Sequence, residues 1–168
     1  MWSSDRRSVL SLVALAALSG CGFTPAFGTH GPAEVLVNAV RAADPQDKNG
    51  FDFVQRIEER FGRPTGGLYD LTYTITTAPV GVGITPDGAT TRYNLTGSID
   101  WALIRQSDGE RLTGGQVRSF TSYSATGSTV AGLTAAEDAA LRLMRILADQ
   151  IVARLTASAG SFAPGSAP

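Results

Sequence analysis

Hydrophobic and polar positions follow two different periods along residues 34–157, and the changes of period predict six elements. Residues 34–41 are rich in Val with partial alternation, which predicts a first strand. Across residues 51–61 the apolar side chains recur at helical spacing, with charged side chains between them. This second stretch predicts an amphipathic helix.

The ends of the predicted helices carry recognisable signals. Asp47 or Asn49 is a suitable N-cap for the first helix, and Gly62 is a common stop residue. Thr134 with Glu137 three residues later forms a capping box, which predicts the start of a long C-terminal helix. The apolar stripe of that helix consists of Ala140, Leu143, Met144, Leu147, Ala148, Ile151, Val152 and Leu155.

Three further stretches alternate with a period of two and predict strands with one dry and one wet face. The first begins at Leu68, the second spans residues 92–103, and the third spans residues 110–124. Pro and Gly residues in the segment 79–88 predict a loop. The sequence Ser107-Asp108-Gly109 predicts a hairpin turn.

Two glycine positions carry structural predictions of their own. Gly97 falls on the dry face of its strand, where a missing side chain lets a helix approach closely. Gly114 and Gly115 interrupt the last strand, and Phe120 is out of phase with Val117. We therefore expect a bulge near Gly114.

The element order βαβββα predicts an α+β fold. Two helices with one apolar face each must pack on the dry face of the sheet, which gives a two-layer α/β sandwich with a four-stranded mixed sheet. The opposite face then consists of polar side chains: Thr72, Thr74, Thr76, Asn94, Thr96 and Ser98. Such a face is either a solvated antiparallel sheet or a surface that docks in a wet, polar environment.

The N-terminus has the layout of a secretory signal. A short charged start precedes the apolar run 9–18, and Leu18-Ser19-Gly20-Cys21 resembles a bacterial lipobox. A single membrane span would need about 20 apolar residues, so this run is too short. We expect cleavage before Cys21, with a diacylglycerol on its sulfur and an acyl chain on its amine. Arg6-Arg7 faintly resembles a twin-arginine signal, and the export route stays open.

These segments divide the chain into four parts. Residues 1–20 are the predicted signal peptide, and residues 21–33 are the lipidated N-terminus and tether. Residues 34–157 form the predicted domain, and residues 158–168 a predicted disordered tail. In proteobacterial lipoproteins an Asp after the lipidated cysteine tends to hold the protein in the inner membrane. This chain has Gly22 there, so we expect the protein to be anchored to the periplasmic side of the outer membrane.

Charge and residue usage exclude several function classes. Removal of residues 1–20 takes away Asp5, Arg6 and Arg7, which leaves 12 basic and 14 acidic residues and a net charge of −2. A nucleic-acid binder usually has a clustered basic excess. The only histidine is His30, and the only cysteine is the predicted lipid site. We expect no enzyme, no metal site and no cofactor besides the covalent lipid.

The start Cys21-Gly22-Phe23-Thr24-Pro25, followed by this order of elements, resembles the LptE family of lipopolysaccharide-assembly lipoproteins, in its alphaproteobacterial form. The resemblance implies a non-enzymatic protein that plugs the lumen of the outer-membrane β-barrel LptD. Such a protein helps the barrel assemble and assists lipopolysaccharide transport to the cell surface. The implied partners are an LptD-like barrel, lipopolysaccharide and the membrane through the lipid anchor. The hydroxyl-rich face would suit a polar barrel interior.

Lipopolysaccharide phosphates would need cationic partners, for which guanidinium groups are well suited. The candidates in or beside the predicted strands are Arg92, Arg105, Arg111 and Arg118. A second reading of the sequence stays open, that of an auxiliary lipoprotein of a periplasmic lipid-transport ABC system.

Overall fold

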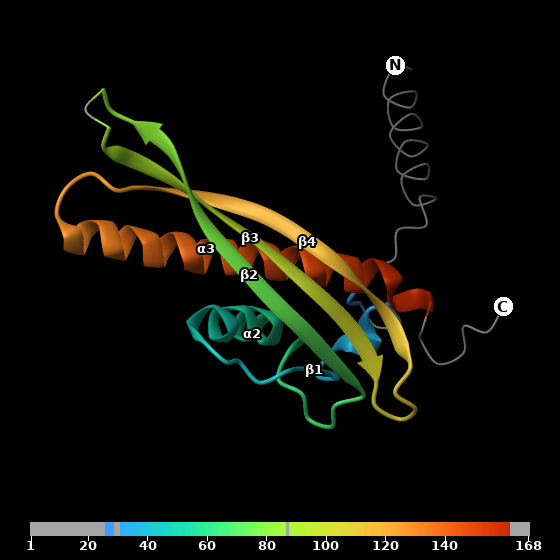
Figure 1. Ribbon diagram of the computed structural model, residues 1–168. Helices are drawn as coiled ribbons and strands as arrows, with labels where there is room; N and C mark the ends of the chain where they lie inside the picture. The colour runs from blue at the N-terminus through green and yellow to red at the C-terminus, as the bar shows by residue number, and fades with distance from the viewer. Residues whose placement is uncertain (1–25, 29–30, 87, 162–168) are drawn as a thin grey trace, which may run out of the picture.

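The computed structural model has a four-stranded sheet with both long helices on one side (Figure 1). It describes residues 26–28, 31–86 and 88–161, so the predicted signal peptide, Cys21 and the end of the tail lie outside the described residues. The strands are β1 (Val40–Ala42), β2 (Tyr69–Ile84), β3 (Thr90–Arg105) and β4 (Arg111–Ser124). The helices are α2 (Lys48–Phe61) and α3 (Thr129–Ser158), with short 3-10 turns η1 (Glu34–Leu36) and η2 (Ala159–Ser161). The predicted two-layer α+β sandwich is confirmed.

The sheet has the order β1-β2-β3-β4 and is mixed. Strand β1 pairs with β2 in parallel over three residues, from Val40 opposite Tyr69 to Ala42 opposite Leu71. The other two pairs are antiparallel and long, with β3 in the centre. Beyond Leu71, β2 therefore has no strand neighbour on its β1 side among the described residues.

Helix α2 has a side-chain N-cap at its start and a glycine at its end. The Asp47 carboxylate accepts a hydrogen bond from the Gly50 N–H at 2.7 Å, which confirms one of the two predicted N-caps. Gly62 ends the helix with φ +83°, a conformation that favours glycine, and its N–H donates to the Glu58 carbonyl. The charged side of α2 faces outward, while Phe53, Ile57 and Phe61 are buried.

The core lies between the dry face of the sheet and the two helices. Its largest side chains come from α2, α3 and the sheet, and they include Phe53, Leu71, Leu103, Leu143, Leu147 and Ile151. Gly97 allows the close approach that the sequence predicts, because a Cβ there would lie 2.9 Å from Leu143 Cδ2. The Thr121 hydroxyl donates to the Ala139 carbonyl at 2.8 Å and ties β4 to α3 inside the core.

The first predicted strand is wrong in its bounds. Residues 34–36 form a 3-10 turn, and only Val40–Ala42 pair as a strand. The reason is the burial of both Ala33 and Leu36, three residues apart, and the left-handed conformation of Asn38 at φ +54°. That conformation interrupts the extended backbone, and the strand begins only at Val40.

The predicted loop at residues 79–88 is mostly strand. β2 continues to Ile84 and β3 begins at Thr90, so the connection is only five residues long. Pro79 is tolerated because β2 is an edge strand here, where a missing N–H costs no ladder bond. The glycines mark register shifts at Gly81, Gly83 and Ile84 within the strand pair.

The predicted bulge near Gly114 and the predicted start of α3 both shift in position. The bulge is present two residues earlier: the register shifts opposite Leu103 and Ile104, which leaves Leu112 as the extra residue, and Gly114 and Gly115 pair regularly with β3. Helix α3 begins five residues before the predicted capping box, with Ser128 as its N-cap.

The domain also extends beyond its predicted limits at both ends. Ala159 is fully buried within η2, in the segment predicted as a disordered tail. Ala33, in the predicted tether, is also fully buried, and its N–H donates to the Ala26 carbonyl. Small apolar residues of the two ends thus complete the core.

Candidate functional site

The face of the sheet opposite the helices, called the outer face below, displays the polar residues that the sequence predicts. Thr72, Thr74, Thr76 and Thr96 are exposed there, and Asn94 and Ser98 are half-buried. They stand in neighbouring rows because β2 and β3 pair in register, with Thr76 opposite Ser98. Neither long helix covers this face (Figure 1).

Part of this polarity is used within the sheet itself. The Thr72 hydroxyl donates to the Ala102 carbonyl at 3.3 Å, and the Thr96 hydroxyl donates to the Ala78 carbonyl at 2.9 Å. The Ser122 hydroxyl donates to Asn94 Oδ1 at 2.6 Å. Thr74 makes no side-chain hydrogen bond with other described residues, so its hydroxyl is free for a partner.

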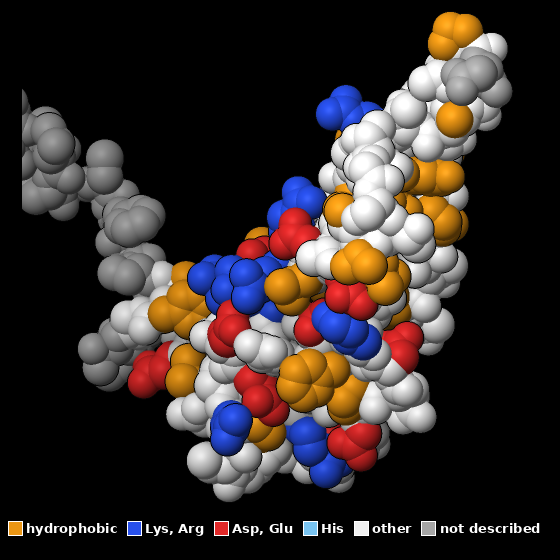
Figure 2. All heavy atoms as spheres, turned by 90° about the vertical axis from the view of Figure 1, so that its left-hand side faces the viewer, with side chains coloured by type: hydrophobic (Ala, Val, Ile, Leu, Met, Phe, Trp, Pro, Cys, Tyr) orange, Lys and Arg blue, Asp and Glu red, His pale blue; other side chains and the backbone are white. Residues whose placement is uncertain are grey.

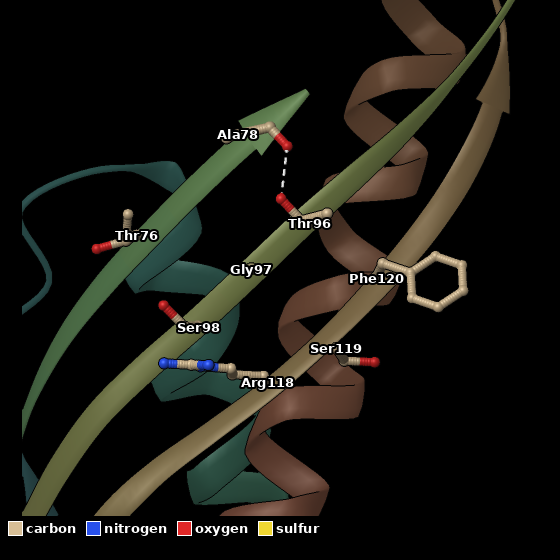
Figure 3. A pocket seen from close by; sticks show the side chains of 8 residues that line it. All are labelled: Thr76, Ala78, Thr96, Gly97, Ser98, Arg118, Ser119 and Phe120. Atoms are coloured by element: carbon tan, nitrogen blue, oxygen red, sulfur yellow. Dashed lines mark hydrogen bonds between the residues drawn. The ribbon is translucent and has the colours of Figure 1, made fainter. Parts of the chain in front are cut away.

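A hollow of about 490 Å³ lies in the middle of the outer face. Figure 3 shows the residues that line it, which come from β2, β3 and β4. They are Thr76, Ala78, Thr96, Gly97, Ser98, Arg118, Ser119 and Phe120. Their chemistry is that of hydroxyl groups and one guanidinium, bordered by an aromatic ring.

Arg118 is the cation of this hollow. Its side chain extends from β4 across β3 toward Ser98, its register partner (Figure 3). Within the described part of the chain, no carboxylate lies within ion-pair distance of this guanidinium. An unpaired guanidinium above hydroxyl groups can donate to an anionic oxygen such as that of a phosphate.

The ring of Phe120 points away from the other labelled side chains in Figure 3. It is 60% exposed, an unusual position for a large aromatic residue on a polar sheet face. The sequence shows it only as a break in the alternation of β4. Its proximity to the hollow was not predicted.

The four arginines proposed for lipopolysaccharide do not form one cluster. Arg92 and Arg105 stand near opposite ends of β3, and 13 residues of strand separate them by about 40 Å. Arg111 lies beside the same turn as Arg105. Arg118 lies between these two ends, opposite Ser98.

Arg105 is also engaged within its own turn. Its Nη1 lies 2.8 Å from an Asp108 carboxylate oxygen and 2.7 Å from one of Glu110. The hydrogen bond that Arg105 donates to the Asp108 carboxylate is the main reason that the pKa of Arg105 is raised above its ordinary value. This guanidinium is therefore neutralised locally, unlike that of Arg118.

A second polar cluster lies at the base of the outer face, where β1 meets β2. The Asp70 carboxylate accepts hydrogen bonds from Arg41 Nε and Gln106 Nε2, both at 2.9 Å. Burial alone would raise the pKa of Asp70, but the hydrogen bonds from Gln106 and Arg41 outweigh it and lower the pKa. The cluster joins β1, β2 and the β3–β4 turn and has a structural role.

The long β2–β3 hairpin projects past α2 as an arm, formed by residues 78–91 (Figure 1). Asp87 is the only charged residue between Asp70 and Arg92 in the sequence. Charged side chains accordingly gather on the body of the molecule in Figure 2, and the arm has few. Exposed apolar side chains occur toward its end, with Ile84 at 71% exposure. The sequence pattern predicted a loop at residues 79–88 and therefore did not predict the arm. The scarcity of charged residues in this segment is nevertheless visible in the sequence.

The described residues show no sign of a metal centre or of a membrane-crossing helix. No three His, Cys, Asp or Glu side chains gather in the part of the chain that the structure covers. None of the described helices is long and apolar enough to cross a membrane.

The sequence profile of the family "LptE: Lipopolysaccharide-assembly" matches residues 37–155, which include every strand and almost all of both helices. The chain belongs to the LptE family. LptE proteins are lipopolysaccharide-assembly lipoproteins and not enzymes. A search of curated proteins finds no match to the chain.

Solved structures share the LptE fold at low sequence identity. A candidate lipoprotein from Caulobacter crescentus CB15 aligns with a TM-score of 0.66 at 18% identity, over 77% of this chain and 98% of that one. The rare lipoprotein B of Shewanella oneidensis aligns with a TM-score of 0.56 at 13% identity, over 71% and 93%. A minor lipoprotein from Acinetobacter baumannii gives 0.51 at 14% identity, over 71% and 89%. At these identities the likeness shows the fold.

Proposed function

We propose that this protein is an outer-membrane lipoprotein, anchored on the periplasmic side by lipid on Cys21. Its domain occupies the lumen of an LptD-like β-barrel, helps that barrel assemble, and assists the passage of lipopolysaccharide to the cell surface. The observation that carries the proposal is the outer face of a chain from the lipopolysaccharide-assembly family. This face is open and hydroxyl-rich along β2 and β3, and its few charged side chains include Asp100 and Arg118.

The hydroxyl groups of the outer face are suited to a confined space that contains water, such as the interior of a barrel. The interior of an outer-membrane barrel is polar and water-filled. Hydroxyl side chains form and exchange hydrogen bonds there without the desolvation cost of a charge. Thr74, Thr76, Thr96 and Ser98 are thus suited to lie against a barrel wall, with Thr72 and Asn94 at the borders of the same surface.

The arm supports the same placement. It has one charged residue and several exposed apolar ones, and it extends away from the body that carries most of the charges. Exposed apolar side chains are unfavourable in water. Inside a barrel, those of the arm could contact the barrel loops or the lipid part of the transported molecule.

The first test places bulky charges on the outer face. In a confined interface, Thr74→Lys and Thr96→Glu would press two bulky charged side chains against the barrel wall and strip them of water, whereas on a free surface such changes cost at most about 0.5 kcal/mol. We expect the double variant to keep the wild-type melting temperature, recover less barrel complex on affinity purification, and let large antibiotics cross the outer membrane.

The matched control puts the same charges on exposed threonines away from the outer face, Thr65→Lys and Thr134→Glu. This control should assemble normally. If the face variant also assembles and seals the membrane as the wild type does, the lumen proposal is wrong. Recovery of an inner-membrane transporter in place of a barrel would contradict it as well.

The second test concerns lipopolysaccharide. Of the four candidate arginines, Arg118 is unpaired beside the hollow, Arg92 and Arg111 are exposed, and Arg105 is ion-paired in its turn. We expect Arg118→Ala to weaken lipopolysaccharide binding by about tenfold, the effect of losing one charge-assisted contact of about 1.4 kcal/mol.

Arg105→Ala serves as the control because its charge is already neutralised. It should bind as the wild type does in the same titration. Equal binding by wild type and Arg118→Ala, with both folded by circular dichroism, would remove the hollow from the lipopolysaccharide site.

A further inference from the structure

Three backbone carbonyls on the free edge of β4 accept hydrogen bonds from side chains of α3. Arg142 Nη2 donates to the Ser122 carbonyl at 3.4 Å, and Gln150 Nε2 donates to the Arg118 carbonyl at 3.5 Å. Arg154 Nη1 donates to the Gln116 carbonyl at 2.7 Å. These carbonyls point away from β3, on the edge where a further strand would otherwise add.

The spacing of these bonds follows from the two backbones. From Arg142 to Arg154, twelve helical residues rise about 18 Å. The six strand residues from Gln116 to Ser122 span about 20 Å. Side chains four residues apart on α3 can therefore reach alternate carbonyls of β4.

One position in this series is apolar. Ile146 lies midway between Arg142 and Gln150, and Phe120 lies midway between Ser122 and Arg118. Ile146 is 39% exposed, and Phe120 is more exposed still. The edge therefore has polar donors on three carbonyls and two exposed apolar side chains at the level of the fourth.

Strand β4 itself has few of the features that usually prevent edge pairing: an irregularity near one end, at Leu112, and a single charged residue, Arg118, over residues 112–124. It contains neither Pro nor Lys, and it runs for 14 residues. The other long edge, that of β2, has Pro79 and register shifts near Gly81 and Gly83. An unprotected strand of this length pairs readily with another chain.

We propose that Arg142, Gln150 and Arg154 form an edge cap that keeps β4 from pairing with the β4 of a second molecule. The partner excluded by the cap is another copy of this chain, because identical edges with the same apolar position at Phe120 match each other when paired antiparallel. The cap is a property of the protein before it meets any other partner, and it is independent of the proposed function.

The test removes the cap in the full-length protein, with Arg142→Ala, Gln150→Ala and Arg154→Ala combined. Sedimentation equilibrium in density-matched detergent should show a wild-type monomer. The uncapped variant should shift toward a dimer as its concentration rises. A matched variant with Arg145→Ala, Arg63→Ala and Gln55→Ala loses the same residue types elsewhere and should stay monomeric.

A second substitution locates the contact. Phe120 directs its N–H away from β3, so Phe120→Pro in the uncapped background removes an edge donor without breaking the ladder to β3. It should restore the monomer, whereas Phe120→Ala in the same background should not. For a variant that keeps donors, Arg142→Lys with Arg154→Lys, we expect a monomer.

Three results would overturn the proposal. One is an uncapped variant that is folded by circular dichroism and monomeric at every concentration. Another is a dimer that Phe120→Pro leaves intact. The third applies if the triple variant does not fold. The single variant Arg154→Ala, which removes the shortest of the three hydrogen bonds, is then tested in its place, and a strictly monomeric Arg154→Ala would overturn the proposal.

Discussion

At the scale of single residues, three buried polar atoms have no hydrogen-bond partner among the described residues: Tyr73 Oη, Trp101 Nε1 and Thr156 Oγ1. Tyr73 is the most informative, because its ring packs on Phe53 with centroids 4.6 Å apart. Burial of the phenol raises its pKa, and the carboxylates of Asp47 and Asp44 add to the rise. The ring contributes to the core while the hydroxyl costs free energy.

We therefore expect Tyr73→Phe to be at least as stable as the wild type at neutral pH, by up to about 1 kcal/mol. Its pH dependence should also differ. Above about pH 10 the unfolded chain loses the phenolic proton while folded Tyr73 retains it, so the wild type loses stability as the pH rises. Urea unfolding between about pH 9 and pH 11 should show a smaller loss for Tyr73→Phe. A parallel decline in both proteins would contradict this account.

At the scale of elements, the start of α3 shows two competing capping signals. The sequence offers the capping box Thr134 with Glu137, yet the helix begins at Thr129 with the Ser128 hydroxyl accepting from the Ala131 N–H at 3.3 Å. Thr134 lies inside the helix and donates to the Val130 carbonyl at 3.1 Å. The earlier cap extends α3 toward the end of the molecule from which the arm projects (Figure 1).

The position of the cap can be measured directly. Ser128→Ala should lower the free energy of unfolding by about 0.5–2 kcal/mol, the usual cost of an N-cap. Thr134→Ala should change it by less than about 0.5 kcal/mol, because its backbone is already within the helix. Chemical denaturation of the two variants distinguishes these outcomes. A larger loss for Thr134→Ala would place the functional cap at the capping box.

At the scale of the whole molecule, the two ends of the described chain meet at one end of the sandwich. A Cβ at Gly160, in η2, would lie 3.8 Å from the Pro32 side chain, and Ala26 packs against the same core. The 30 residues of α3 run from that end toward the arm over about 45 Å. This length exceeds the hydrocarbon thickness of a bilayer, about 30 Å. The domain is thus long enough for the place in a barrel lumen that we propose.

The anchor itself gives the whole-molecule prediction. Cys21→Ala should leave the protein uncleaved or free in the periplasm, because a lipid with two or more acyl chains holds a protein on a membrane far more firmly than the domain surface would. Cell fractionation with salt and carbonate washes measures this. Retention of the variant in the outer membrane at wild-type levels would show that the lipid on Cys21 is not its attachment.

Much of the fold follows from local sequence because local chemistry and burial agree there. The helical spacing around Phe53 and Ile57, the stop at Gly62 and the turn at Gly109 each depend on a few neighbouring residues, and the structure has them where the sequence predicts. The alternation of polar residues also placed Thr74, Thr96 and Ser98 correctly on one face, because the side-chain period of a strand is fixed at two.

Other features depend on residues distant in sequence. Pro79 and the glycines after it are typical of a loop, and only the absence of a strand neighbour beside β2 allows them to continue the sheet. The start of α3, by contrast, was decided locally by the Ser128 cap, ahead of the capping box at Thr134, because Val130 and Leu133 in its first turns are exposed.

By itself, the sequence determined the class of fold, the polar face and the family resemblance, because each arises from patterns within a few tens of residues. Only the tertiary structure decided which arginines share a surface, where the hollow lies, and that α3 caps the edge of β4. Those features require β3, β4 and α3 to lie side by side. Their separation in space is fixed by register and helix packing, which no local pattern of residues encodes.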